Sequence, residues 1–285
     1  MTAEAPHPPL ADLLQIEPGL SVLRLAALYA GPDGRLDDET LDLMFAQVQA
    51  GVLATVAPRD IWQELALGLM APKPSNMLRA LFACSALHAI LPEVATVFGV
   101  PQIADDPPQV DIGQHLLRVL DLAAAAGAPL SVRFAALVMH AGKSDSPPEH
   151  LPVHYRHVER GRPRIEALCE RFDIPDDCRE LALLALAECE RVHRVTQTRA
   201  GPVAVMLERL GAFEHPERFE RLMTLCACDY GAYRGRTPGA YPKAALLRIA
   251  LQACTDVTAG EGAVEARAAA IAAVLRSERW TNADC

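Results

Sequence analysis

The sequence predicts an all-α protein that is built in two helical parts. Of its 285 residues, 51% are hydrophobic but only 5% are aromatic, and Ala and Leu are abundant. This composition favours helices packed on helices over sheets, which are rich in β-branched and aromatic residues. The sequence contains no clear apolar run of period two and no hairpin dipeptide between such runs. We therefore expect helices connected by loops.

Two segments carry the helical period most clearly. In the segment 37–51, apolar side chains follow the spacing i, i+3, i+4 and i+7 at Leu41, Met44, Phe45 and Val48. An acidic first turn and Gly51 predict where this helix begins and ends. The segment 164–172 repeats the spacing at Ile165, Leu168, Cys169 and Phe172. Each of the two helices should therefore bury one face.

The remaining helices are expected between clusters of proline and glycine. Their approximate ranges are 19–30, 58–71, 76–90, 111–127, 129–141, 176–193, 201–211, 216–230, 241–253 and 262–278. The loop 100–109 is the expected boundary between an N-terminal part of four or five helices and a larger C-terminal bundle. We expect a flexible leader over 1–14, followed by domains over 15–100 and 101–285.

The net charge limits the functions that the chain can have. A formal charge of −9 argues against a surface that binds nucleic acid through counterion release alone, so RNA contact would need a local basic patch. The eight cysteines are scattered, mostly in apolar helical runs, which is typical of buried thiols in a reducing compartment. No stretch approaches the ~20 apolar residues that cross a membrane. We expect a cytoplasmic protein without a membrane partner.

Histidines concentrate in the second part of the chain. His115, His140, His150, His154, His157 and His193 all lie there, together with Asp229. Imidazoles drawn from several helices are a common way to bind a transition metal in a bundle. The alternative interpretation is that each histidine is an ordinary core or surface residue. Phosphate-binding loops and the motifs G-x-G-x-x-G, H-E-x-x-H and G-x-S-x-G are missing.

Six strings occur in the order of one known family. Between about residues 15 and 250 they read DIWQELALGLMAPKPSNMLRALFACSALHAILPEVATVFGVPQ, VDIGQHLLRVLDLAAAAGAPLSVRFAAL, LPVHYRHVERG, LCERFDIPDDCRELALLALAE, HPERFERLM and YRGRTPGAYP. On these strings the chain resembles bacterial tRNA nucleotidyltransferases, the CCA-adding enzymes of the multifunctional type. The resemblance implies neck and body helices like those of poly(A) polymerases and CCA-adding enzymes over 15–100. It implies an HD-type helical phosphohydrolase domain with tail helices over 101–285.

The chain departs from this family where the family transfers nucleotides. A nucleotidyltransferase head with metal-binding carboxylates would precede residue 15, where this sequence has only a short leader. The family reads the incoming nucleotide through a Glu-Asp-x-x-Arg motif. Here Glu17 remains, while Pro18 and Ser21 stand where that motif has Asp and Arg, and neither can pair with a base edge in the same way. We expect that the chain does not add CCA by itself, and we assign no catalytic residue.

The family's HD motif is also altered. The string HAGKS would read His-Asp-Leu-Gly-Lys in the family, so Ala141 replaces a carboxylate that binds metal. The metal ligands that the resemblance implies, if the site is retained, are His115, His140, His154, His157, His193 and Asp229. Glu190 or Asp145 could replace the missing carboxylate. We expect either no cofactor or a divalent ion such as Ni²⁺, Mn²⁺ or Mg²⁺ in a degraded pocket.

Three hypotheses for function follow. The leading one is a degenerate paralogue, a pseudoenzyme that binds tRNA or another structured RNA. Its candidate phosphate contacts are Arg24, Lys73, Arg79, Arg156, Arg160, Arg162, Arg164, Arg234, Arg236 and Lys243. The alternative for the dense string RHVERGRPR is a solvated helix start, partly paired with Glu159 and Glu166.

The second hypothesis is an HD-type, metal-dependent phosphohydrolase that acts on phosphoesters or cyclic nucleotides. The third is a partner subunit that docks on a separately encoded nucleotidyltransferase head or forms a homo-oligomer. An apolar patch near LSVLRLAALYA would support this third hypothesis.

Overall fold

A computed structural model describes residues 17–32, 34, 36–194 and 199–277, and it confirms the all-α prediction. The expected leader over 1–14 lies outside the described residues. The helices of the N-terminal part are α2 (Pro18–Tyr29), α3 (Asp38–Gln49), α4 (Pro58–Met70), α5 (Pro74–Ala83), α6 (Ala86–Ile90) and α7 (Pro92–Ala95). Those that follow are α8 (Ile112–Ala125), α9 (Leu130–Val138), α10 (His157–Phe172), α11 (Asp176–His193), α12 (Ala200–Arg209), α13 (Pro216–Gly231), α14 (Pro242–Ala253) and α15 (Ala263–Ser277). Short 3₁₀ turns cover Val52–Thr55, Pro148–His150 and Pro238–Ala240.

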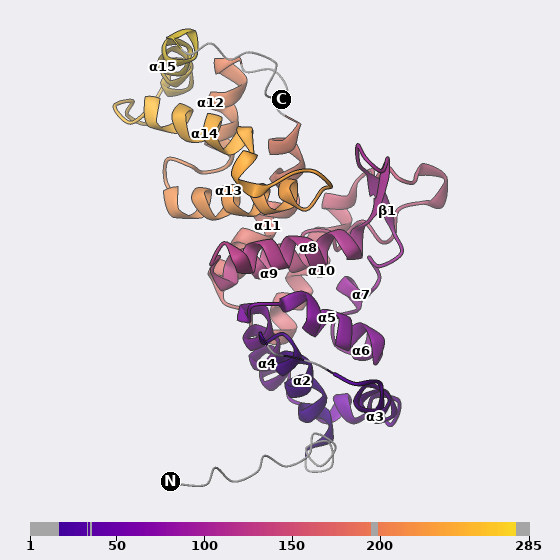
Figure 1. Cartoon of the computed structure of the whole chain (residues 1–285). Helices are drawn as coiled ribbons and strands as arrows, with labels where there is room; N and C mark the ends of the chain where they lie inside the picture. The colour runs from indigo at the N-terminus through magenta and orange to yellow at the C-terminus, as the bar shows by residue number, and fades with distance from the viewer. Residues whose placement is uncertain (1–16, 33, 35, 195–198, 278–285) are drawn as a thin grey trace, which may run out of the picture.

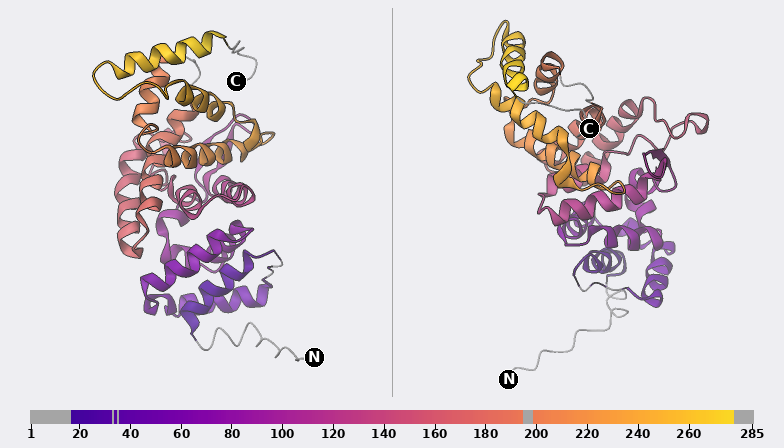
Figure 2. Two further views of the ribbon diagram at one scale, coloured as in Figure 1. Left: turned by 90° about the vertical axis from the view of Figure 1, so that its left-hand side faces the viewer. Right: turned by 45° about the horizontal axis from the view of Figure 1, so that its top comes forward.

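The helices form a stack with three levels (Figure 1). Helices α2 to α6 lie at one end, α8 to α11 with α13 lie in the middle, and α12, α14 and α15 lie at the other end. Figure 2 shows the same order from two further directions. No helix among the residues that the structure describes combines the length and apolar character needed to span a bilayer.

The N-terminal helices are packed directly on the middle level. The ring of Trp62 on α4 meets that of Phe134 on α9 edge-on at 5.6 Å. Ser75 on α5 donates hydrogen bonds to Asp121 on α8 from its backbone N–H at 3.2 Å and its hydroxyl at 2.9 Å. The buried guanidinium of Arg133 donates to carbonyl oxygens of the α4 end at 2.8 and 3.0 Å. These contacts join the two halves across the expected boundary at 100–109. The division into two domains stays a prediction.

Two local features position the middle level. Asp111 caps the start of α8, where its side chain accepts from the N–H of Gln114 at 2.7 Å. Gly142, in the turn after α9, lies against α10, and a Cβ there would collide with the carbonyl oxygen of His157 and the backbone of Gly161. A glycine at 142 therefore allows this turn to approach α10 closely.

The structure differs from the sequence-based prediction in two places. The helix expected over 76–90 is divided into α5 and α6, because Ser85 adopts a left-handed backbone with φ +64°. Strands β1 (Pro101–Ile103) and β2 (Gln109–Asp111) form an antiparallel hairpin that begins in the segment 100–109, predicted as a loop, and ends at Asp111, with Gln102 opposite Val110. Strands of three residues are too short to show an alternating apolar pattern.

Candidate metal centre

Two histidines and one aspartate meet in the middle level of the stack. His115 comes from α8, His140 from the turn after α9, and Asp229 from α13. Oδ1 of Asp229 lies 2.8 Å from Nε2 of His115 and 3.9 Å from Nε2 of His140. The three residues are 0%, 7% and 6% exposed, and one ligand atom from each lies within 4.8 Å of the others. We call this set the His-His-Asp group.

The His-His-Asp group has the chemistry of a metal site. Nε2 of His140 and Nδ1 of His115 are buried and have no hydrogen-bond partner in the protein, although buried polar atoms are nearly always paired. Burial, and to a smaller extent the charge of Lys143, hold the pKa of His140 well below its usual value. His140 is therefore a neutral imidazole at neutral pH, which is the form that binds metals.

Asp229 is held from its other side by His193, at the end of α11. Nε2 of His193 lies 3.0 Å from Oδ2 of Asp229, and Nδ1 lies 2.8 Å from the hydroxyl of Tyr241. Burial opposes ionisation, but the imidazoles of His115 and His193 outweigh it and keep the pKa of Asp229 well below its usual value. The group therefore presents a carboxylate between two imidazoles.

A second polar cluster adjoins this group. The ammonium of Lys143 lies 2.9 Å from Oε1 of Glu190 and donates to Oε1 of Gln102 at 3.0 Å. Nε2 of Gln102 is 3.3 Å from the hydroxyl of Tyr233, whose ring lies 4.4 Å from the ring of His115. Burial opposes the charge of Glu190, yet Lys143 and the nearby His157 lower the pKa of Glu190. These contacts connect the hairpin, through Gln102, to both clusters.

The six expected ligands are not all brought together. His154 donates from Nε2 to the carbonyl of Pro101 at 2.9 Å, so its Nδ1 accepts from the Ser146 hydroxyl at 2.7 Å. Both of its ring nitrogens are thus occupied. His157 donates from Nδ1 to the carbonyl of His154 at 2.8 Å, and its Nε2 lies 3.6 Å from Glu190. His154 and His157 therefore lie outside the His-His-Asp group, which His193 contacts through Asp229.

Ala141 is buried and offers a methyl group where the resembled family has a carboxylate. Its carbonyl accepts from Arg164 at 2.8 Å. The two expected replacements are engaged elsewhere. Glu190 pairs with Lys143 at 2.9 Å, with Arg194 at 2.9 Å and more distantly with His157, while Asp145 pairs with Arg164.

The ten candidate RNA contacts lie on separate parts of the molecule, and each has a partner. Arg24, Lys73 and Arg79 belong to the N-terminal helices and contact Glu17, Glu64, Asp121 and Gln114. Arg156 is the N-cap of α10 and pairs with Glu159. Arg160 donates to the carbonyl of Gly142 and the hydroxyl of Ser146. Arg162 pairs with Glu166, and Arg164 pairs with Asp145. Arg234 and Arg236 pair with Asp106 and Asp105. Lys243 also has a contact.

Sequence reasoning did not identify several residues at this site. Lys143, Gln102, Tyr233 and Tyr241 are linked to it only through tertiary contacts. Cys189 had a detectable signal, since it precedes His193 by four residues and so shares a face of α11 with it.

Comparison with known proteins identifies relatives. No family model matches the chain. The chain is 44% identical over 222 residues to a multifunctional CCA protein of Cupriavidus necator, which is 78% of this chain and 54% of that protein. It is 43% identical over 241 residues to a multifunctional CCA protein of Burkholderia cenocepacia, and the match covers 85% of this chain and 58% of that protein. It is 41% identical over 244 residues to a multifunctional CCA protein of Chromobacterium violaceum, and the match covers 86% of this chain and 60% of that protein.

These matches cover between 78% and 86% of this chain, whereas the chain spans between half and three fifths of the length of the relatives. At more than 40% identity over such a length, common ancestry is the explanation for the similarity. The chain is thus homologous, over about 85% of its length, to the bacterial multifunctional CCA proteins.

Proposed function

We propose that this chain is a metal-dependent phosphohydrolase that acts on a phosphoester or cyclic phosphate of tRNA or a related RNA. The observation that carries the proposal is the buried, unpaired Nε2 of His140, which faces Oδ1 of Asp229 at 3.9 Å. The homology to multifunctional CCA proteins supports the RNA substrate class.

The residues of the His-His-Asp group fit a divalent ion. Two imidazole nitrogens and one carboxylate oxygen are three protein ligands, and sites with three protein ligands leave positions open for reactants. When bound there, a divalent ion supplies Lewis-acid stabilisation of phosphoryl oxygens. His193 orients the Asp229 carboxylate. The hydroxyl of Tyr241 in turn orients the ring of His193.

The neighbouring cluster would receive the substrate. The buried ammonium of Lys143 is a compact cation next to the His-His-Asp group, and Glu190 and Gln102 hold it in place. His157 has one ring nitrogen fixed by a backbone carbonyl and its Nε2 directed at Glu190. We assign Lys143 to binding phosphate charge and His157 to proton transfer.

Metal content and turnover test this proposal. The full chain, purified without a His-tag or chelator, should contain metal, and it should hydrolyse a 2′,3′-cyclic phosphate or a 2′-nucleotide in Ni²⁺, Mn²⁺ or Mg²⁺. His140→Ala should remove this activity and one metal ion per chain. His150→Ala is the matched control, because His150 is exposed and lies outside the group. Wild-type protein that holds no ion at this site and turns over no phosphoester would refute the proposal.

A second candidate function is RNA binding without catalysis. It is supported by Ala141, which lacks the carboxylate of the resembled family, and by the four arginines along α10. Exposed ion pairs such as Arg162 with Glu166, at 3.7 Å, contribute only about 0–1 kcal/mol, so phosphate can displace them. Salt-sensitive tRNA binding that Arg156→Glu and Arg162→Glu weaken, in protein without turnover, would favour this candidate.

A third candidate is a subunit that docks on a nucleotidyltransferase head or on a second copy. Leu28 on α2 and Leu67 on α4 are 63% and 65% exposed, and Met70 is also exposed. Their helices pack together. Co-purification of a head domain that is lost in Leu28→Glu would support this candidate. A wild-type chain that is monomeric and binds no head domain would exclude it.

A further inference from the structure

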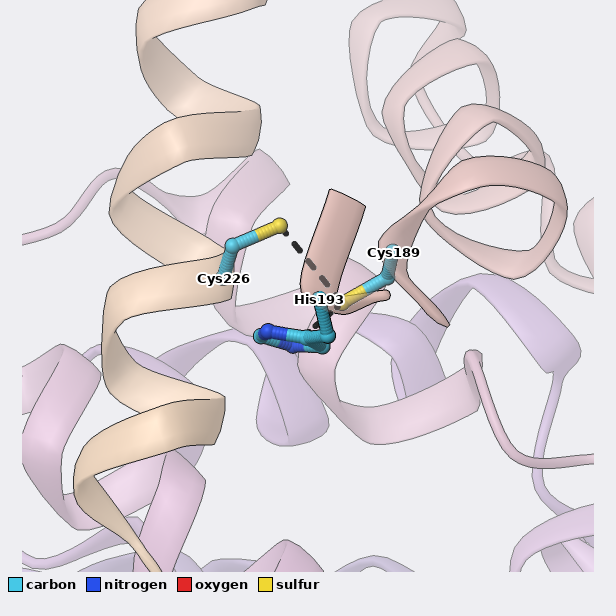
Figure 3. Close-up of side chains that lie close together, drawn as sticks. All are labelled: Cys189, His193 and Cys226. Atoms are coloured by element: carbon cyan, nitrogen blue, oxygen red, sulfur yellow. Dashed lines mark hydrogen bonds between the residues drawn. The ribbon is translucent and has the colours of Figure 1, made fainter. Parts of the chain in front are cut away.

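A second cluster of potential metal ligands lies between α11 and α13 (Figure 3). Cys189 and His193 occupy one face of α11, and Cys226 projects toward them from α13. Sγ of Cys189 lies 3.5 Å from Sγ of Cys226 and 3.4 Å from Nε2 of His193. Both cysteines are free and buried.

We propose that Cys189, His193 and Cys226 bind a thiophilic transition-metal ion of the Zn²⁺ class, at a second site that adjoins the His-His-Asp group through His193. The spacing of the ligand atoms supports this. In a tetrahedral zinc site, two sulfur ligands are about 3.8 Å apart and a sulfur and a nitrogen about 3.6 Å apart, from bond lengths near 2.3 and 2.05 Å. The observed distances of 3.5 and 3.4 Å need only a small expansion.

One contact of His193, that of its Nδ1, is typical of a metal ligand. Its Nδ1 lies 2.8 Å from the hydroxyl of Tyr241. With an ion on Nε2, Nδ1 carries the hydrogen and donates it to the tyrosine oxygen, which fixes the tautomer and the ring plane. The side chain of His193 is 24% exposed, so the fourth position of the ion is reachable by a water molecule or a small ligand.

Charge balance also favours a divalent ion. When a divalent ion binds, the two thiols lose two protons and form two metal–sulfur bonds, so the complex of ion and thiolates has no net charge. A neutral complex avoids the cost of an isolated charge in the core.

The ligand types separate the two sites. Two thiolates and an imidazole prefer Zn²⁺ over Mg²⁺, Mn²⁺ or Ca²⁺, whereas a carboxylate with two imidazoles accepts harder ions. Nε2 of His193 faces both Cys189 and Asp229. Binding at the sulfur site therefore releases Oδ2 of Asp229 from His193.

Cobalt titration of the full, reduced, metal-stripped chain tests the proposal. Bound Co²⁺ should produce thiolate-to-cobalt charge-transfer absorption with tetrahedral d–d bands, and Zn²⁺ should displace it. Cys226→Ser and Cys189→Ser should weaken Zn²⁺ binding by more than the roughly 10–100-fold that loss of an outer-shell partner costs. Cys254→Ser is the matched control, because Cys254 is also buried but its thiol donates a hydrogen bond to the backbone carbonyl of Arg267 instead.

X-ray absorption on zinc-loaded wild type keeps the test independent of variant folding. We expect two sulfur ligands in the first shell, unchanged in His140→Ala. A shell of nitrogen and oxygen only, or the absence of charge-transfer absorption in the reduced protein, would each overturn the proposal. His140→Ala affects the phosphohydrolase proposal alone, and Cys226→Ser affects this site first.

Discussion

Nε2 of His115 lies 2.8 Å from Oδ1 of Asp229, although 114 positions separate the two residues in the chain. Their contact joins α8 to α13 in the centre of the stack (Figure 1). Both side chains are buried, so the pair depends on neighbours that compensate the carboxylate charge. His193 provides this compensation on the opposite oxygen, at 3.0 Å.

Asp229→Asn should therefore lower both stability and metal affinity. The amide is nearly isosteric but removes a charge that two imidazoles contact, and we expect a loss of about 1–3 kcal/mol in unfolding free energy. Denaturant titration measures this loss, and elemental analysis measures the metal content. Asp256→Asn, on an exposed position, should change neither. Full metal occupancy in Asp229→Asn would show that the carboxylate is not a ligand.

Gly142→Ala should destabilise the turn after α9. A Cβ at this position would collide with the His157 carbonyl and the Gly161 backbone, so the turn must move away from α10. We expect a loss of about 1–3 kcal/mol, as for other overpacked sites. Thermal unfolding measures the change.

Gly201→Ala is the matched control for this change. Gly201 lies in the first turn of α12 with open space around its Cα. Alanine there should be neutral or stabilise by roughly 0.4–1 kcal/mol, because it restricts the unfolded chain. If both variants had the same stability, steric contact at 142 would not be the cause.

Arg133→Met should weaken the packing of α4 on α9. Arg133 is 4% exposed and donates to three backbone carbonyls, those of Leu69, Ala71 and Ala128. Without these hydrogen bonds the buried carbonyls are unsatisfied, which costs about 1–3 kcal/mol for each affected group. Chemical denaturation measures the loss. Arg59→Met, an exposed position on α4, should stay within about 0.5 kcal/mol of wild type.

The N-cap of α3 predicts a pH-dependent contribution to stability. The backbone N–H of Thr40 donates to the side chain of Asp37 at 2.6 Å and lowers the pKa of Asp37. A carboxylate whose folded pKa is depressed stabilises the fold above its unfolded pKa, near 3.9, and this contribution is lost as the pH falls through the folded pKa.

Asp37→Ala should consequently be less stable than wild type at pH 7, and the difference should shrink as the pH falls below the unfolded pKa of Asp, near 3.9. Denaturant curves at several pH values measure the difference. Asp42→Ala, on the exposed face of the same helix, should show no such convergence. A difference between Asp37→Ala and wild type that is constant with pH would contradict the ionised cap.

The helices are the part of the fold that the sequence predicts best. The segment 37–51 contains α3 and the expected range 176–193 coincides with α11. The reason is that the spacing i, i+3, i+4 is a local property of successive residues. The break at Ser85 carries no such signal, because no glycine or proline marks it. Phe82 stacks on Phe98 at 4.4 Å beside this break, a contact that only the tertiary structure creates.

The candidate site divides in the same way. The residue types and the family resemblance by themselves predicted six possible ligands, which include His115, His140 and Asp229. They also identified Ala141 as a position without a ligand atom. Only the packing of α8, α9, α11 and α13 decided that these three converge while His154 is occupied by Pro101 and Ser146. The same packing placed Cys226 beside Cys189. Helical periodicity is encoded within one turn, whereas convergence depends on how distant helices bury their apolar faces together.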